Sequence, residues 1–117
     1  MTVEEEVRAL NDTFERALTE QDAETLVALF TDDARMLIDG QPVIQGREAI
    51  AQVMRGWVAD GPVSTRFETV EVFASGELVV DIGYTIQASG RGKYVVIHRR
   101  GEDGLLRIAV DAPSRGA

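Results

Sequence analysis

The spacing of apolar residues changes at Asp60-Gly61-Pro62, and this change constrains the fold more than any other feature of the sequence. Before it, apolar residues recur at steps of three and four, as in an amphipathic helix. After it, they alternate with polar residues, as in a strand with one buried face. The helical half is interrupted after Thr31-Asp32-Asp33 by two short expected strands, Ala34–Ile38 and Val43-Ile44. The sequence therefore predicts an α+β protein whose helices precede most of its sheet.

Three helices are expected in the first half of the chain. Thr2 and Glu5 have the spacing of a capping box, which predicts that the first helix begins there. Asp22 is the expected cap of the second helix. The third helix opens at Gly46 and stops at Asp60-Gly61-Pro62. Each helix has an apolar stripe that must be buried against another element.

Four strands are expected after the third helix, at Val63–Ala74, Glu77–Ala88, Lys93–Arg100 and Leu105–Ala112. Short connections that contain glycine separate them, and such connections favour hairpins and hence an antiparallel meander. An apolar sheet face must be covered, and the three helices can cover it. We expect a single domain over residues 1–117: a curved antiparallel sheet, shaped as a cone or half-barrel, covered by three helices that enclose a pocket.

Composition excludes several functions. Acidic residues outnumber basic ones by 20 to 12, giving a formal charge of −8, so a nucleic-acid partner is not expected. The chain has no cysteine, no carboxylate–histidine spacing typical of metal sites and no glycine-rich nucleotide loop, so neither a metal nor a cofactor is expected. No apolar run approaches the ~20 residues of a membrane span, and the N-terminal residues lack a signal pattern. We expect a cytoplasmic protein without membrane contact.

The order of these elements and several short motifs resemble the SnoaL-like group of the nuclear-transport-factor-2-like superfamily, which also contains ketosteroid isomerase. The resemblance covers almost the whole chain and is carried by Asp22–Ala34, Ile44–Ile50 and Gly92–Val96, with Asp103-Gly104 and Asp111. The superfamily includes isomerases, polyketide cyclases, hydrolases, dehydratases and proteins that only bind or associate. The motifs are mostly structural, so they indicate the fold rather than the reaction.

Ketosteroid isomerase combines an aspartate base with an oxyanion hole made of a tyrosine and a protonated aspartate. The resemblance places Phe14 where that tyrosine would be and Val96 where the protonated aspartate would be. The base would fall at Ile38 or, with a shift of one residue, at Asp39. Phe14 and Val96 donate no hydrogen bond, and one such donor is worth about 3 kcal/mol in the transition state. The ketosteroid isomerase mechanism is therefore disfavoured.

His98 and Asp111 are the first candidates for catalysis. Strand alternation puts His98 on the same face as Tyr94 and Val96, and the resemblance implies that this face looks into the cavity. A neutral imidazole there can transfer protons near pH 7. Asp111 matches a commonly acidic SnoaL-like position on the neighbouring strand, where it would orient His98. The alternatives are a packed or solvated histidine and a carboxylate that pairs with an arginine or caps a turn.

Asp39 and Tyr84 complete the expected catalytic group. Asp39 follows the central strand at the expected pocket rim and is a candidate base, with Asp81 as a second carboxylate, although Asp39-Gly40 is also an ordinary turn sequence. Tyr84 is expected to donate a hydrogen bond to a developing oxyanion. The large apolar residues belong either to the pocket wall or to the core; those expected to contact a ligand are Phe14, Phe30, Met36, Trp57 and Val96.

Two functional hypotheses follow. In the first, the protein is an isomerase, cyclase or dehydratase that moves a proton on a hydrophobic carbonyl or polyketide-like metabolite without a cofactor. In the second, it is a ligand-binding or association module without catalysis, which the missing oxyanion donors favour. Superfamily members usually pair through the outer face of the sheet. The mixed apolar and charged face of Lys93, Val95, Ile97 and Arg99 therefore predicts a homodimer.

Overall fold

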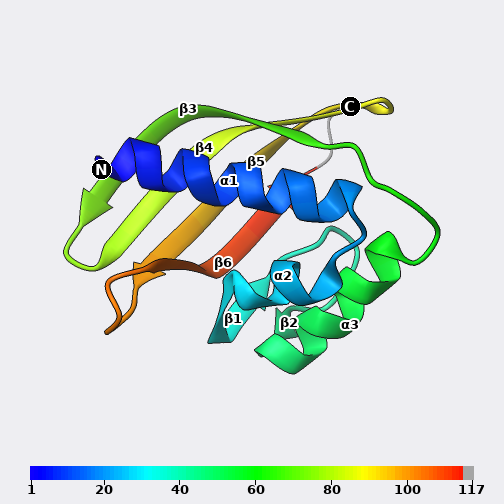
Figure 1. The fold of residues 1–117 in the computed structure, drawn as a ribbon, viewed down its shortest axis with the longest axis horizontal. Helices are drawn as coiled ribbons and strands as arrows, with labels where there is room; N and C mark the ends of the chain where they lie inside the picture. The colour runs from blue at the N-terminus through cyan, green and yellow to red at the C-terminus, as the bar shows by residue number, and fades with distance from the viewer. Residues whose placement is uncertain (115–117) are drawn as a thin grey trace.

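The computed structural model of the protein describes residues 1–114, which form three helices and six strands (Figure 1). The helices are α1 (Val3–Thr19), α2 (Ala23–Ala28) and α3 (Arg47–Val58). The strands are β1 (Phe30–Met36), β2 (Ile44–Gln45), β3 (Arg66–Ser75), β4 (Leu78–Gln87), β5 (Gly90–Arg100) and β6 (Leu106–Ser114). The predicted α+β class, with three helices before the main run of strands, is confirmed.

The helices begin where their sequence signals place them. The Thr2 hydroxyl accepts from the Glu5 amide at 3.1 Å, and the Glu5 carboxylate accepts from the Thr2 amide at 2.9 Å, which confirms the capping box. Asp22 accepts from the Thr25 amide at 3.1 Å at the start of α2. The buried stripe of α1 consists of Val7, Leu10, Phe14, Ala17 and Leu18. Burial of this stripe fixes which face of α1 meets the sheet.

The six strands form one open, curved sheet in the order β2-β1-β6-β5-β4-β3. Strands β3 to β6 make the predicted antiparallel meander. β1 joins this meander by a parallel pairing with β6 and pairs antiparallel with β2. Figure 1 shows α1 lying across β3, β4 and β5, whereas α2 and α3 lie beside β1 and β2. The helices therefore cover one face of the sheet and leave the other uncovered.

β1 begins earlier than predicted. It starts at Phe30 instead of Ala34, so Asp32 and Asp33 lie within the strand and do not form the expected break. Phe30 pairs with Ile108 of β6, and the register shifts before Arg35, which accommodates the irregular stretch. Tertiary pairing with β6 thus extends the strand into residues whose local sequence favours a turn.

The core lies between the helices and the covered face of the sheet. Phe14 of α1 packs edge-on against Phe30 and Phe67, with ring centroids 6.3 Å and 5.4 Å apart. Phe67 in turn contacts the Tyr94 ring at 5.8 Å. No helix within residues 1–114 is both long and apolar enough to cross a membrane.

Candidate functional site

Two aspartates lie in one row that crosses the covered face of the sheet. The strand register places Asp81 of β4 opposite Val96 of β5, Val96 opposite Asp111 of β6, and Asp111 opposite Met36 of β1. Directly opposed residues share a face of the sheet. Asp81 is completely buried and Asp111 is 8% exposed. Two carboxyl groups therefore lie buried between the helices and the sheet, among mostly apolar residues.

Asp81 is held by a network that joins α1 to three strands. The Tyr94 hydroxyl donates to both Asp81 oxygens, at 3.0 and 3.1 Å, and Asn11 Nδ2 of α1 donates to Oδ2 at 3.1 Å. Thr69 Oγ1 of β3 shares a hydrogen bond with the Tyr94 hydroxyl at 3.1 Å. Burial raises the pKa of Asp81, and the hydrogen bonds from Asn11 and Tyr94 oppose this rise. Burial also raises the pKa of Tyr94 well above its usual value, so its proton is firmly held.

A glycine makes room for this network. Gly83 lies opposite Tyr94 on β5 and opposite Thr69 on β3. A Cβ atom at Gly83 would collide with the Glu68 carbonyl oxygen and lie 2.8 Å from the Tyr94 hydroxyl. This position therefore requires glycine for close packing beneath the tyrosine.

Asp111 has different surroundings. Its carboxyl group has no hydrogen-bond partner among residues 1–114, and burial alone raises its pKa to about 7. An acid with a pKa near 7 is half ionised at neutral pH, the condition in which a carboxyl group can both give and take a proton. The row thus contains one carboxyl group fixed by donors and one that is free.

His98 is completely buried, and neither of its ring nitrogens has a hydrogen-bond partner in the described part of the chain. Burial lowers its pKa to about 4, so the imidazole is neutral at pH 7. It shares the covered face with Val96, as alternation predicts, and pairs with Ile108 beside a bulge in β6. The His98 ring donates no hydrogen bond to Asp111, because both of its nitrogens are without a partner in the described part of the chain. Asp111 therefore does not orient the imidazole in this structure.

Asp39 and Tyr84 are not brought to this row. Tyr84 alternates with Gly83 on β4 and so faces the opposite side of the sheet, where the Arg91 guanidinium lies 4.1 Å from its ring centre. Tyr84, the expected donor to a developing oxyanion, therefore lies on the face of the sheet opposite to His98. Asp39 is exposed in the turn after β1, consistent with its turn sequence. The phenol that does lie on the covered face is Tyr94.

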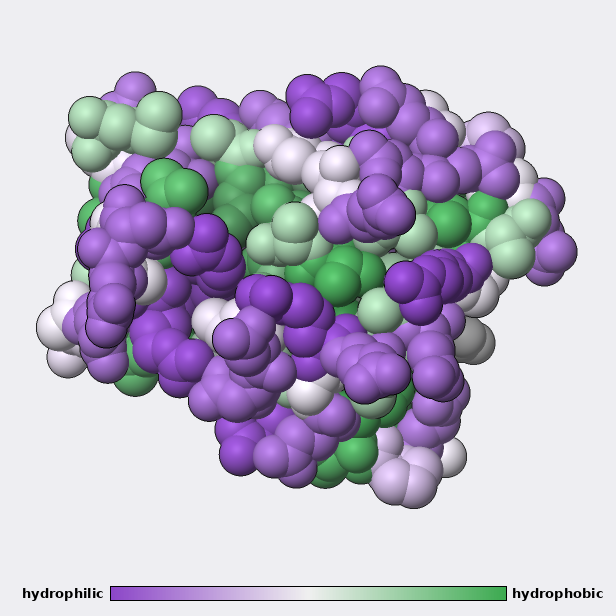
Figure 2. All heavy atoms as spheres, turned by 60° about the horizontal axis from the view of Figure 1, so that its bottom comes forward, coloured by the Kyte–Doolittle hydropathy of each residue, from purple (hydrophilic) through white to green (hydrophobic). Residues whose placement is uncertain are grey.

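The residues expected to contact a ligand divide into two groups. Trp57 is 40% exposed on α3, and the others are buried in the core: Phe14, Phe30, Met36 and Val96. Apolar residues also reach the surface among polar ones on the face seen in Figure 2. The four buried residues fill the space between the helices and the sheet, where the sequence predicted a pocket wall.

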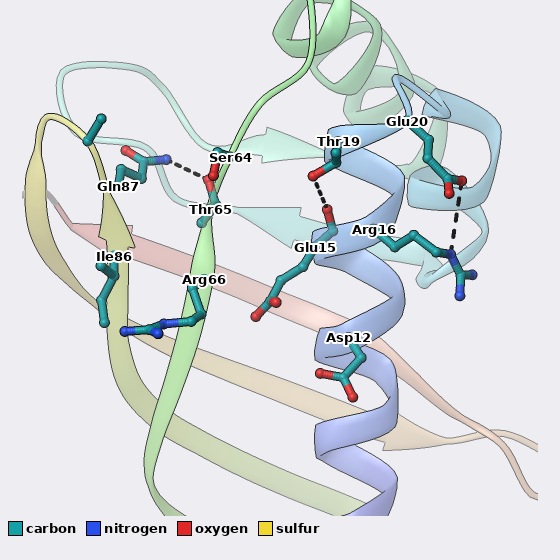
Figure 3. A pocket seen from close by; sticks show the side chains of 11 residues that line it. Asp12, Glu15, Arg16, Thr19, Glu20, Ser64, Thr65, Arg66, Ile86 and Gln87 are labelled. Carbon is teal, nitrogen blue, oxygen red and sulfur yellow. Dashed lines mark hydrogen bonds and ion pairs between the residues drawn. The ribbon is translucent and has the colours of Figure 1, made fainter.

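Two hollows border α1 instead. The larger, of about 910 Å³, separates the second half of α1 from the start of β3 and the end of β4; Figure 3 shows Glu15 and Thr19 on one side and Arg66 and Ile86 on the other. The smaller, of about 300 Å³, lies between the first half of α1 and β3. None of the five residues expected to contact a ligand lines either hollow.

The Asn11–Tyr94 part of the site was not predicted as a unit. One signal was present, because Asn11 lies on the apolar stripe of α1 between Leu10 and Phe14, where a polar residue needs a buried partner. Its partner Asp81 is 70 residues away, so no local spacing identifies it. Within residues 1–114, no group of three or more histidine, aspartate or glutamate side chains is arranged to hold a metal ion.

Comparison with known structures shows a common fold. A protein assigned provisionally as an association domain of calcium/calmodulin-dependent protein kinase type II, from Thiobacillus denitrificans, aligns with a TM-score of 0.80 at 18% identity, over 94% of each chain. A protein of the nuclear-transport-factor-2-like family from Streptomyces avermitilis, assigned provisionally as a dehydratase, aligns with a TM-score of 0.74 at 21% identity, over 97% of this chain and 95% of that one.

A ketosteroid isomerase-like protein from Erwinia carotovora atroseptica aligns with a TM-score of 0.73 at 19% identity, over 95% of this chain and 94% of that one. No curated protein matches the sequence. The profile of the SnoaL-like domain matches residues 10–109, which include the second and third helices and nearly the whole sheet. The chain therefore belongs to the family of SnoaL-like domains.

Proposed function

We propose that this SnoaL-like protein binds a small apolar carbonyl compound, such as a polyketide-like metabolite, and moves a proton on it without a cofactor. An isomerase, a cyclase or a dehydratase performs this kind of step. The observation that carries the proposal is Asp111, a carboxyl group on the covered face of the sheet that has no partner and a pKa of about 7. A base removes a proton from the carbon next to a carbonyl most efficiently when its pKa lies near the working pH.

His98 supports the same proposal in a different role. A buried imidazole with two unpartnered nitrogens lacks the hydrogen bonds that buried polar groups normally make. A ligand with a hydroxyl or carbonyl group would supply one of them. Because its pKa is about 4, His98 would act as a neutral hydrogen-bonding group and not as an imidazolium. Asp111 is therefore the proposed proton carrier, and His98 the group that positions the ligand.

Binding without chemistry is the second candidate. The positions that resemble the oxyanion donors of ketosteroid isomerase hold Phe14 and Val96, and both are buried apolar residues of the core. Both hollows lie beside α1 and away from Asp111. These observations favour a ligand-binding or association module, and the likeness in fold to the protein named for an association domain is consistent with it.

The exchange of ligand protons with solvent separates the two candidates. Cyclic ketones and aromatic β-diketones would be incubated with the protein in D₂O, and deuterium uptake next to the carbonyl followed by NMR. We expect uptake that rises with pH through about 7, as Asp111 ionises. Asp111→Asn should slow it by about 100-fold or more. Asp60→Asn, at an exposed aspartate after α3, should leave the rate unchanged. Binding without uptake would establish the second candidate and exclude the first.

We also propose that the protein forms a homodimer through the uncovered face of the sheet. Two apolar rows cross this face, Phe73–Val80–Ile97–Val110 and Ile82–Val95–Ala112. Phe73 is 48% exposed, Leu78 41% and Val95 40%. A contiguous exposed apolar patch of this kind is typical of an interaction surface.

Light scattering after size exclusion tests the dimer. The wild type should have twice the chain mass of 12.8 kDa at micromolar concentration. Val95→Glu should yield a monomer, because it places a charge in the centre of the patch. Val43→Glu is the matched control, since Val43 is 55% exposed outside the sheet face. A monomeric wild type would contradict the proposal.

A further inference from the structure

The smaller hollow has a polar floor, and buried residues beneath it hold the floor side chains in place by hydrogen bonds. Asn11 of α1 and Thr69 of β3 line it, and these residues are hydrogen-bonded to the buried Asp81 and Tyr94. The Asn11 side chain donates one amide hydrogen to Asp81, so its carbonyl oxygen and its second N–H can bind another partner. The floor thus offers both an acceptor and donors, and they are held in place before any ligand arrives.

The walls of the hollow are apolar and depend on an irregularity in β3. Phe67, Val70 and Val72 line the hollow, and Val70 is 63% exposed there. The β3–β4 register shifts between Thr69 and Glu71, which makes Val70 the extra residue of a bulge. Such bulges re-aim side chains and are frequent near functional sites. Without this one, Thr69 and Val72 would lie on opposite faces of the strand.

The volume of the smaller hollow and the charges at its rim restrict which ligands it can bind. A volume of about 300 Å³ is at the small end of the range of ligand sites. The charged residues at the rim are Glu4, Asp12 and Glu71 against Arg8, an excess of negative charge that disfavours anions. The neutral amide and hydroxyl of the floor suit a hydroxyl, carbonyl or amine group.

We propose that the hollow between α1 and β3 is a binding site for a small molecule with an apolar body, one hydrogen-bonding group and no negative charge. Asn11 and Thr69 recognise its polar group, and Phe67, Val70 and Val72 contact its body. Asp81 and Tyr94 act as positioning residues beneath them. This site is separate from Asp111, since β5 lies between the two aspartates. The inference therefore does not depend on the proposed proton transfer.

Three probes with one aromatic body test the proposal: benzyl alcohol, benzylamine and benzoate. Each would be titrated into isotope-labelled protein, and the NMR signals of the Asn11 side-chain amide and of the β3 backbone followed. We expect saturable shifts at Asn11 and Thr69–Val72 with the alcohol and the amine, and binding of benzoate at least ten-fold weaker. Absence of shifts at these residues, or equal binding of benzoate, would overturn the proposal.

Two variants assign the recognition to the floor. Thr69→Val keeps the shape of the side chain and removes its hydroxyl, and it should weaken benzyl alcohol binding at least five-fold. Thr65→Val is the control, because Thr65 lines the larger hollow, where it is hydrogen-bonded to Gln87. Equal affinities of the two variants would count against the assignment. Asp111→Asn should bind the probe like the wild type while losing proton exchange, so failure of one proposal is distinguishable from failure of the other.

Discussion

Asp81 and Asp111 show how strongly a residue's function depends on its immediate partners. Both are buried on the same face of the sheet, on either side of Val96. Asp81 accepts hydrogen bonds from Asn11 and Tyr94, whereas burial alone acts on Asp111. A carboxylate surrounded by donors is stabilised in one position, and one without donors is free to exchange its proton. We therefore assign positioning to Asp81 and proton transfer to Asp111.

The network around Asp81 should contribute measurably to stability. Tyr94→Phe removes the hydroxyl that Asp81 and Thr69 share, and it leaves Asp81 with Asn11 as its donor. We expect the free energy of unfolding in urea to fall by about 2 kcal/mol, because a buried acceptor loses a partner. Tyr84→Phe, on the opposite face, should change it by about 0.5 kcal/mol or less. Equal losses in the two variants would show that the network does not stabilise the fold.

At the scale of the element, Arg47 connects α3 to the start of β1. Its Nε and Nη2 donate to the Phe30 carbonyl at 3.2 and 2.7 Å, and its Nη1 lies 2.7 Å from Asp32. The Asp32 side chain is 89% exposed, so that ion pair contributes little. The bond to the Phe30 carbonyl is the significant one. It holds the irregular part of β1 next to the N-terminus of α3.

Replacing Arg47 by lysine tests this connection. A lysine ammonium cannot span the carbonyl and the carboxylate as the planar guanidinium does. We expect a loss of about 1 kcal/mol in unfolding free energy, with faster hydrogen exchange of the Ile108 amide, which donates to Leu29 at 2.7 Å. Arg55→Lys, at an exposed position on the same helix, provides the control. Unchanged exchange at Ile108 would mean that β6 alone holds this end of β1.

Elements that depend on near neighbours were predictable from the sequence. The Thr2–Glu5 capping box, the Asp22 cap and the alternation of β4 and β5 all involve residues within a few positions of each other. The early start of β1 was not predicted, because β6 supplies its pairing partner from the other end of the chain. The face of His98 followed from alternation, but its distance from Asp111 depends on the β6 bulge, which has no local signal.

At the scale of the whole molecule, Asp111 and His98 have opposite effects on how stability changes with pH: as pH rises, the contribution of Asp111 falls and that of His98 grows. The folded pKa of Asp111, about 7, is above its ordinary value of 3.8, so Asp111 favours folding fully below pH 3.8, and this contribution is lost as pH rises to 7. The folded pKa of His98, about 4, is below 6.5, so its contribution is complete above pH 6.5 and is lost as pH falls to 4.

A difference of one between the folded and unfolded pKa of a group corresponds to about 1.4 kcal/mol of unfolding free energy. The two contributions are similar in size because the two pKa values are shifted by similar amounts. The contribution of Asp111 is about 4 kcal/mol and that of His98 about 3 kcal/mol. Relative to the wild type, Asp111→Asn should therefore gain about 4 kcal/mol in unfolding free energy between pH 4 and pH 8, and His98→Gln should lose about 3 kcal/mol. Urea unfolding at half-unit pH steps measures both, with Asp60→Asn following the wild type throughout. Parallel curves of unfolding free energy against pH for all four proteins would show that folding shifts the pKa of neither group. The proton-transfer role of Asp111 would then lose its physical basis.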